Sequence, residues 1–412
     1  MSMKRRVVIT GMGTVNPLGI GVEQSWQALC EGRSGISVVT RFDCSGMRTT
    51  VGGEVRGFNA RDFLPEKLAR RTDRFQHFAL AAAHMAIEDS KLSITADIAE
   101  RVGVSIGTAF GGVESATAGQ DQFRTGGREE ISPFFVPMLL TGMAAGQVAM
   151  RFGAKGPNYS LTTACSAGTH SIGESCRIIQ RGEADVMLAG GSEAPLVPVL
   201  NQCFGIMGAT TAMSDPARAS RPFDADRDGF VPAEGSGVLV LEDLESALRR
   251  DAFIYAEIVG FAATADAYHV TSPSPGGEGA VRCMRLALKD ACMQPEHVDY
   301  INAHGTSTKL NDSTETQAVK TVFGDHASHV PLSSNKSMIG HTMGASGAIE
   351  AIFSILTIRN GTIPPTINYT SPDPECDLDC VPNVARQQTV KTVMSNSFGF
   401  GGVNGSLILR AY

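Results

Sequence analysis

The chain has 412 residues, of which 42% are hydrophobic, and its formal net charge is −7 from 35 basic and 42 acidic residues. This hydrophobic fraction predicts a large folded core and excludes a disordered chain, and the negative balance offers no basic surface for nucleic acid. No apolar stretch approaches the ~20 residues of a membrane span, and the N-terminus lacks a secretory signal pattern. We therefore expect a cytoplasmic protein with no nucleic-acid partner and no membrane insertion.

The nine cysteines are an odd number and lie between Cys30 and Cys380 without CxxC pairs or zinc-finger spacing. This pattern indicates reduced thiols in a reducing compartment. Cys376 and Cys380 are predicted to lie in surface loops. His326 and His329 are close in sequence, but no carboxylate or thiol nearby completes a ligand set, so a solvated loop is favoured over a metal site.

The first part of the chain alternates strands and helices. Residues 6–10 form a β-branched run that predicts a strand, and Gly11-Met12-Gly13 predicts a tight turn after it. This Gly-Met-Gly is only a fragment of a dinucleotide-binding fingerprint, so it does not indicate a nucleotide site. Alanine-rich residues 75–89 predict a helix, and the apolar run 101–108 predicts a strand buried on both faces.

The next feature is the stretch of residues 158–179, which contains Cys165. A β-branched run tightens into a turn of small residues and then takes the pattern of an amphipathic helix. A cysteine at such a turn meets the positive end of the helix macrodipole, which favours the thiolate and makes a nucleophile. A small buried cysteine that packs the turn is the competing interpretation, so other residues must decide between the two.

The second half of the chain repeats the pattern of the first. A strand is predicted at 254–261, a helix at 280–293 and a strand at 298–302. Residues 229–242 and 399–410 share a Gly-Phe loop followed by Gly-Ser and an apolar strand. Such a long-period echo predicts a duplicated α/β fold with helices covering the sheets. We place the two halves at residues 1–249 and 250–412.

Two loops of the second half carry histidines. His304 follows a predicted strand, and ligand sites of α/β sheets collect at strand ends, although a core histidine with satisfied hydrogen bonds is an equal alternative. His341 shares a polar loop with Lys336, ahead of a mostly apolar helix over residues 345–359. That helix contains Glu350, which is costly to bury alone, so we expect Lys336, a cation or backbone N–H groups beside it.

The last motif, residues 396–402, combines glycines that let the backbone approach a ligand with two phenylalanines that could close a pocket. A cysteine with one histidine and an orienting Asn or Asp would suit a papain-type hydrolase. A cysteine with two neutral histidines suits a different reaction, in which Nε2–H groups stabilise an enolate while the sulfur holds an acyl group. That reaction is carbon–carbon bond formation by decarboxylative Claisen condensation.

Four motifs, TTACSAG around Cys165, NAHGTST, NKSMIGHT and NSFGFGG, together resemble the β-ketoacyl-acyl carrier protein synthases, most closely the synthase II branch. The resemblance runs from Arg5 to the C-terminus. It implies a thiolase-like fold of two duplicated halves in α-β-α-β-α layers, a homodimer, and elongation of fatty acids by condensation with malonyl-acyl carrier protein. No redox or other cofactor is implied, because the substrates are carried on the phosphopantetheine arm of the carrier protein.

The resemblance also implies a role for each matching residue. Cys165 is the nucleophile, and His304 and His341 support decarboxylation. The other implied roles are oxyanion-hole N–H groups at Cys165 and Phe400, support of the histidine loops by Lys336 and Glu350, phosphopantetheine binding by Thr306 and Thr308, and a gating loop with Phe398 and Phe400. A metal is not required, although a structural monovalent cation can lie near Asn302, Glu350, Ser395 and Asn396.

Two departures from the family pattern bear on specificity. Phe110 stands where synthase II enzymes often carry a smaller aliphatic residue, which predicts a shortened or gated acyl pocket unless the ring packs elsewhere. The basic cluster of Lys67, Arg70 and Arg71 matches a carrier-docking site. However, Glu129 and Glu130 replace basic residues of the family and Gly208 replaces an arginine, so docking should be weakened or redirected toward a specialised carrier.

Several alternatives remain at this point. A ketosynthase of a dedicated polyketide or polyene pathway fits the altered docking surface. A non-catalytic subunit that sets chain length would usually lack the nucleophile, and a thiolase would use a second cysteine as its base. A cysteine hydrolase would release no carbon dioxide from malonyl-carrier.

Overall fold

The computed structural model describes residues 4–127, 129 and 131–412. Eleven strands form one mixed sheet in the order β11-β10-β14-β15-β9-β1-β8-β7-β5-β6, with β2 beside β1. The strands are β1 (Val7–Asn16), β2 (Gly19–Ile20), β5 (Val102–Gly107), β6 (Asn158–Tyr159), β7 (Val186–Glu193), β8 (Gly235–Asp243), β9 (Ala256–Ala265), β10 (Tyr300–Asn302), β11 (Leu332–Ser333), β14 (Thr392–Gly399) and β15 (Val403–Arg410). Two small hairpins pair β3 (Ser37–Val38) with β4 (Val51–Gly52), and β12 (Thr362–Ile363) with β13 (Arg386–Gln387).

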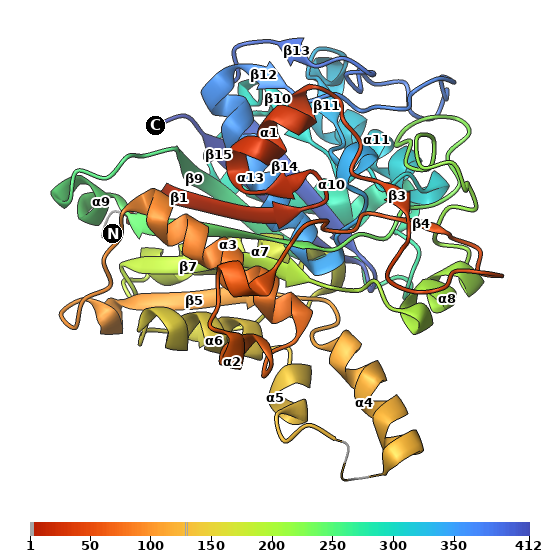
Figure 1. Ribbon diagram of the computed structural model, residues 1–412. Helices are drawn as coiled ribbons and strands as arrows, with labels where there is room; N and C mark the ends of the chain where they lie inside the picture. The colour runs from red at the N-terminus through yellow and green to blue at the C-terminus, as the bar shows by residue number, and fades with distance from the viewer. Residues whose placement is uncertain (1–3, 128, 130) are drawn as a thin grey trace.

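The α-helices flank this sheet (Figure 1). They are α1 (Val22–Cys30), α2 (Glu66–Ala69), α3 (Arg74–Ser90), α4 (Val113–Gly126), α5 (Phe135–Leu139), α6 (Met143–Phe152), α7 (Ala167–Gln180), α8 (Pro198–Ile206), α9 (Leu244–Arg249), α10 (Glu278–Asp290), α11 (Lys309–Phe323), α12 (Lys336–Ile339) and α13 (Ser346–Asn360). Figure 1 shows α4 and α5 projecting from the body of the protein beyond α6. None of the helices in the described part of the chain combines the length and apolar character needed to cross a bilayer.

The sheet consists of two halves with the same topology. In the first half the order in space is β6-β5-β7-β8-β1, and in the second it is β11-β10-β14-β15-β9. If the five strands of each half are numbered along the chain, their order in space is third, second, fourth, fifth, first in both halves. The two halves also have the same parallel and antiparallel strand pairs. The halves meet where Val7–Ile9 of β1 pair antiparallel with 256–258 of β9. The predicted duplication is thus confirmed, while the boundary near Arg249 stays a prediction.

The helices complete the predicted α-β-α-β-α layers. Helices α7 and α13 pack against each other in the middle, and their side chains share one hydrophobic cluster with β1, β8, β9 and β15. Helices α3 and α6 cover the outer face of the first half, and α10 and α11 cover the outer face of the second. The apolar run that forms α13 is therefore buried on all sides, as expected for a central helix.

The predicted turn at residues 11–13 is wrong, because these residues continue strand β1. A Cβ atom on Gly13 would lie 2.1 Å from the carbonyl oxygen of Ala82, and one on Gly11 would lie 2.3 Å from that of Ala86. Both glycines therefore allow α3 to pack directly on the strand. Glycine suits both a turn and a close contact between a helix and a strand. The local sequence pattern therefore could not distinguish the two structures.

The surface positions predicted for Cys376 and Cys380 are also wrong. Both side chains are buried, with 1% and 3% exposure, in the outer cluster of the second half. They belong to a long irregular segment that folds back over α11. Such a segment shows no hydrophobic periodicity, so its packing could not be read from the sequence.

Candidate active site

Cys165 lies in a short 3-10 turn, Ala164–Ser166, that leads directly into α7. The hydroxyl of Ser166 donates to the carbonyl of Val403 at 2.7 Å, which ties the turn to the start of β15. Ala164 adopts a left-handed conformation with φ 50°, a strained geometry for a residue with a side chain. The turn thus presents a side chain with 8% exposure to the central cavity.

His341 is hydrogen-bonded to Cys165, with Nε2 and Sγ 3.1 Å apart. The backbone N–H of Met343 donates to Nδ1 of His341 at 3.2 Å, so Nδ1 is an acceptor and the proton of the neutral ring is on Nε2. Ser346 Oγ lies 3.0 Å from Nδ1. The imidazole of His341 therefore presents an N–H donor to the space beside the sulfur.

His304 completes a set of three. The ring centroids of His304 and His341 are 5.5 Å apart, and one ligand atom each of Cys165, His304 and His341 lies within 4.8 Å of the others. The pKa of both histidines is well below its usual value, because burial and then the positive charge of Lys336 disfavour the imidazolium. A thiol and two neutral imidazoles could bind a metal, and they can equally surround one reactive carbonyl group.

The expected thiolate is not the state of the free protein. Burial raises the pKa of Cys165 to about 11, although the charge of Lys336 and a hydrogen bond from the backbone amide of Phe400 lower it. Desolvation of the sulfur outweighs the charge of Lys336 and the backbone hydrogen bonds, which favour the thiolate. The resting group is therefore a thiol, while the amides of Phe400 and Cys165 already converge on Sγ.

The side chain of Lys336 forms an ion pair with Glu350, and the two side chains are 1% and 0% exposed. This confirms the expectation that Glu350 would not be buried alone. Lys336 begins the short helix α12, three residues after β11 ends, and Glu350 lies one turn into α13. The pair joins the His341 loop to the central helix layer.

Three buried acceptor atoms near this pair have no hydrogen-bond donor among the described residues: Asn302 Oδ1, Glu350 Oε2 and Ser395 Oγ. Asn302 and Ser395 are directly opposite each other on β10 and β14. Oxygen atoms of this kind fit a monovalent cation. Asn396 fits less well, because its Oδ1 already accepts a hydrogen bond from Ser406 at 2.8 Å.

A cavity of ≈ 530 Å³ is lined by Cys165, His304 and His341. It runs from Lys309, Leu310 and Asn311 at the start of α11 to Cys165 and both histidines. The lining also includes four further residues with predicted roles, namely Thr306, Thr308, Phe398 and Phe400. The hydroxyls of Thr306 and Thr308 are 2.9 Å apart. The sequence-predicted binding and gating residues therefore share one wall with the reactive groups.

Phe110 lies at the Cys165 end of this cavity, within the same apolar cluster as the thiol. Its ring contacts Phe204 edge to face with centroids 6.0 Å apart, Phe204 contacts Phe230 at 5.3 Å, and Phe230 contacts His341 at 5.4 Å. The inner pocket is therefore bounded by interlocked aromatic rings, and Phe110 is half-buried at their end.

The predicted docking residues lie apart from this cavity. Lys67, Arg70 and Arg71 are exposed at and after α2, and none of them lines the cavity. Glu129 is exposed beyond α4, and Glu130 lies outside the described residues. Gly208 does line the cavity, on the side formed by the residues after α8.

Two buried glutamates hold the site together and were not predicted. Glu193, at the end of β7, accepts hydrogen bonds from the amides of Ala109, Phe110 and Gly344. Glu315 accepts from the amides of His304 and Gly305, both at 2.8 Å. Burial raises the pKa of each carboxyl to about 7. The sequence did contain a signal for each of them: Glu193 is an acidic residue at the end of an apolar strand, and Glu315 is an acidic residue on the inner face of a helix.

Comparisons with known proteins agree with this geometry. Residues 4–247 match the family model "Beta-ketoacyl synthase, N-terminal domain", and residues 255–370 match "Beta-ketoacyl synthase, C-terminal domain". The 3-oxoacyl-[acyl-carrier-protein] synthase 2 of Synechocystis is 50% identical over 99% of both chains, and that of Staphylococcus aureus is 48% identical over the full length of both.

Two solved structures are also similar over nearly the whole chain. A ketosynthase in complex with its type II polyketide acyl-carrier protein, bound to a hexaketide, has a TM-score of 0.92 at 37% identity and covers 100% of both chains. The ishigamide ketosynthase/chain length factor has a TM-score of 0.93 at 39% identity, with 99% of this chain and 100% of that chain covered.

Proposed function

Because the chain belongs to the β-ketoacyl synthase family, we propose that it is a condensing enzyme of the 3-oxoacyl-[acyl-carrier-protein] synthase 2 kind that elongates fatty acids. The observation that carries the proposal is the convergence of Cys165, His304 and His341 in one cavity. Full-length relatives with this name are 48% to 50% identical to the chain.

The first half-reaction transfers an acyl group to Cys165. The thiol adds to the thioester carbonyl, the carrier thiol leaves with the proton, and an acyl-cysteine remains. In this mechanism the amides of Cys165 and Phe400, which are directed at Sγ in the free protein, are the donors to the oxyanion of the tetrahedral intermediate. Removal of one such donor costs roughly 3 to 4 kcal/mol in comparable sites. No external oxidant or reductant is needed.

The second half-reaction joins two carbons. Malonyl-carrier loses carbon dioxide, and its thioester carbonyl becomes an enolate that is stabilised by N–H groups of neutral His341 and His304. The enolate carbon then attacks the acyl-cysteine, and Cys165 leaves as a thiolate that regains a proton. Because burial and Lys336 keep both imidazoles neutral, they can donate hydrogen bonds without being lost to protonation near neutral pH.

Replacing Cys165 by alanine is expected to abolish condensation, since no other group can hold the acyl chain. The assay combines acyl-carriers of graded chain length with malonyl-carrier and measures the products by mass. Cys176→Ala is the matched control, because it removes another buried thiol of the same segment. Full condensation by the Cys165→Ala enzyme would disprove the proposed mechanism.

A second candidate function is that of a ketosynthase in a specialised polyketide or polyene pathway. It is favoured by the solved ketosynthases described above and by the acidic residue at Glu129. Exposed ion pairs contribute only ~0 to 1 kcal/mol each, so such changes redirect docking rather than abolish it. Turnover measured with the housekeeping carrier and with a dedicated carrier separates the two functions: equal rates on both would argue against specialisation.

Phe110→Ala is expected to shift the longest accepted primer toward greater length, because it removes the ring at the inner end of the pocket. The loss of an aromatic ring also costs about 3 to 5 kcal/mol where it is fully buried, and less at this half-buried position. Graded acyl-carriers measure the change, and Phe123→Ala on exposed α4 is the control. Identical primer profiles for wild type and Phe110→Ala would remove the pocket hypothesis.

Five further properties belong to the same proposal. The enzyme acts as a homodimer in the cytoplasm, and it receives substrates from an acyl carrier protein that docks near Lys67, Arg70 and Arg71. It needs no redox cofactor. A monovalent cation bound by Asn302, Glu350 and Ser395 would contact Oε2 of Glu350, whose Oε1 pairs with Lys336, and anchor β10 to β14. The orphaned oxygens of these three residues support that site.

A further inference from the structure

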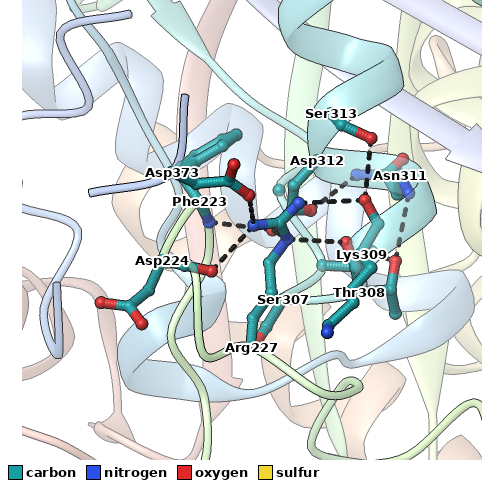
Figure 2. Close-up of polar contacts among 12 residues, drawn as sticks. Phe223, Asp224, Arg227, Ser307, Thr308, Lys309, Asn311, Asp312, Ser313 and Asp373 are labelled. Carbon is teal, nitrogen blue, oxygen red and sulfur yellow. Dashed lines mark hydrogen bonds and ion pairs between the residues drawn. The ribbon is translucent and has the colours of Figure 1, made fainter. Parts of the chain in front are cut away.

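Arg227 lies at the centre of a polar cluster (Figure 2) that includes the cavity-lining residues Thr308 and Lys309. Its side chain is 1% exposed and forms ion pairs with Asp312, at 3.6 Å, and with Asp373. The guanidinium also donates to the carbonyl of Asp224 at 2.8 Å. A buried arginine is costly unless its donors are satisfied, and here the acceptors come from three separate segments of the chain.

The same guanidinium binds the start of α11. Nη2 donates to the carbonyl of Lys309 at 3.0 Å, and Nε donates to the carbonyl of Thr308 at 3.2 Å. Figure 2 shows these two residues on the side of Arg227 opposite Asp373 and Asp224. The rigid fork of arginine can meet two successive carbonyls at once, whereas the ammonium of lysine is a single point of contact.

The rest of the loop between β10 and α11 is held by neighbours of Arg227. Ser307 has a left-handed φ of 68°. Its carbonyl accepts from the amide of Gly229 at 3.0 Å, and its hydroxyl accepts from the amide of Arg221 at 3.0 Å. A strained residue of this kind persists only where its surroundings fix it. The segment 221–229 therefore determines where the loop stands.

Different side chains bind the two ends of the loop between β10 and α11. Glu315 binds the amides of His304 and Gly305, at the end that carries the catalytic ring. Arg227 binds the other end, where the hydroxyls of Thr306 and Thr308 line the outer part of the cavity. Weakening the Arg227 end thus leaves His304 fixed by Glu315, so the two ends can be tested independently.

We propose that Arg227 is a positioning residue for the substrate arm: it holds the Thr306–Thr308 wall of the cavity in place and so determines the affinity for carrier-borne substrate rather than the chemistry at Cys165. This inference rests on the proposed function, in which the phosphopantetheine arm of the carrier binds against the Thr306–Thr308 wall. Arg227 itself touches no substrate and acts through Thr308 and Lys309.

The test compares Arg227→Lys with Asp373→Asn. Lysine keeps the positive charge beside Asp312 and Asp373 but loses the fork, so the KM for malonyl-carrier should rise about tenfold with kcat nearly unchanged. Asp373→Asn removes a charge from the same cluster and leaves the carbonyl contacts, so its KM should stay at the wild-type value. The rate of Cys165 alkylation by iodoacetamide, which needs no carrier arm, should be the same in all three proteins.

A double-mutant cycle with Thr308→Val completes the test, since Arg227→Lys should add little once the hydroxyl is gone. An unchanged KM in Arg227→Lys, or equal KM increases in Arg227→Lys and Asp373→Asn, would overturn the inference. Hydrogen exchange of amides 306–310 gives a readout without activity: faster exchange is expected in Arg227→Lys alone. If the wild type fails to condense any substrate, the proposed function fails, whereas unchanged exchange refutes the positioning role by itself.

Discussion

His341→Ala is expected to slow condensation by about 10²- to 10⁴-fold, the usual contribution of a well-placed group that donates or transfers a proton. The variant removes the Nε2–H donor 3.1 Å from the sulfur of Cys165, so the enolate loses a hydrogen bond. Release of carbon dioxide from malonyl-carrier and formation of the 3-oxoacyl product are the two quantities to measure.

His341→Gln provides a partial rescue, because the glutamine amide can present an N–H group at a similar distance from the backbone. His329→Ala is the control, since that histidine is exposed and does not line the cavity. Wild-type release of carbon dioxide by His341→Ala would show that decarboxylation does not depend on this donor.

Lys336→Met is expected to lower the free energy of unfolding by about 3 to 5 kcal/mol, because it leaves Glu350 buried without its partner. The double variant Lys336→Met/Glu350→Leu should regain most of this loss, since no charge then stays buried. Urea unfolding of the three proteins measures the difference.

Lys320→Met supplies the comparison with an exposed pair. Lys320 and Asp377 are 42% and 52% exposed, so breaking this ion pair should cost no more than about 1 kcal/mol. A double variant as unstable as Lys336→Met would show that the side chains contribute through packing rather than through charge compensation. In the wild type, addition of monovalent salts at constant ionic strength would reveal a bound cation as a cation-specific increase in stability.

Local patterns were sufficient for the regular parts of the fold. The helix predicted at 75–89 is α3, the strand predicted at 101–108 contains β5, and the helix predicted at 345–359 is α13. The echo between 229–242 and 399–410 corresponds to β8 and β15, which occupy the same position in their halves. These predictions succeed because periodic burial and sequence repetition are properties of neighbouring residues.

The errors arise where two structures share one residue type. Gly11 and Gly13 suit a turn and a close helix contact equally, and only the position of α3 decides between them. Cys376 and Cys380 lie in a segment without periodicity, whose burial depends on the surface it packs against. The protonation state of Cys165 also could not be predicted from local sequence, because it depends on how deeply the fold buries the sulfur.

The sequence by itself determined the reactive groups and their order: Cys165, then His304, then His341, with Lys336 beside Glu350 and glycine-rich loops around them. Tertiary structure alone decided that the cysteine is a thiol at rest, that the proton of His341 is on Nε2, and that Phe110 packs against Phe204 at the inner end of the cavity. The physical reason is that residue identity sets which chemistry is available, while desolvation, tautomer and pocket depth depend on distances between segments far apart in the chain. Arg227 illustrates both, because its charge is visible in the sequence and its three carbonyl partners are visible only in the fold.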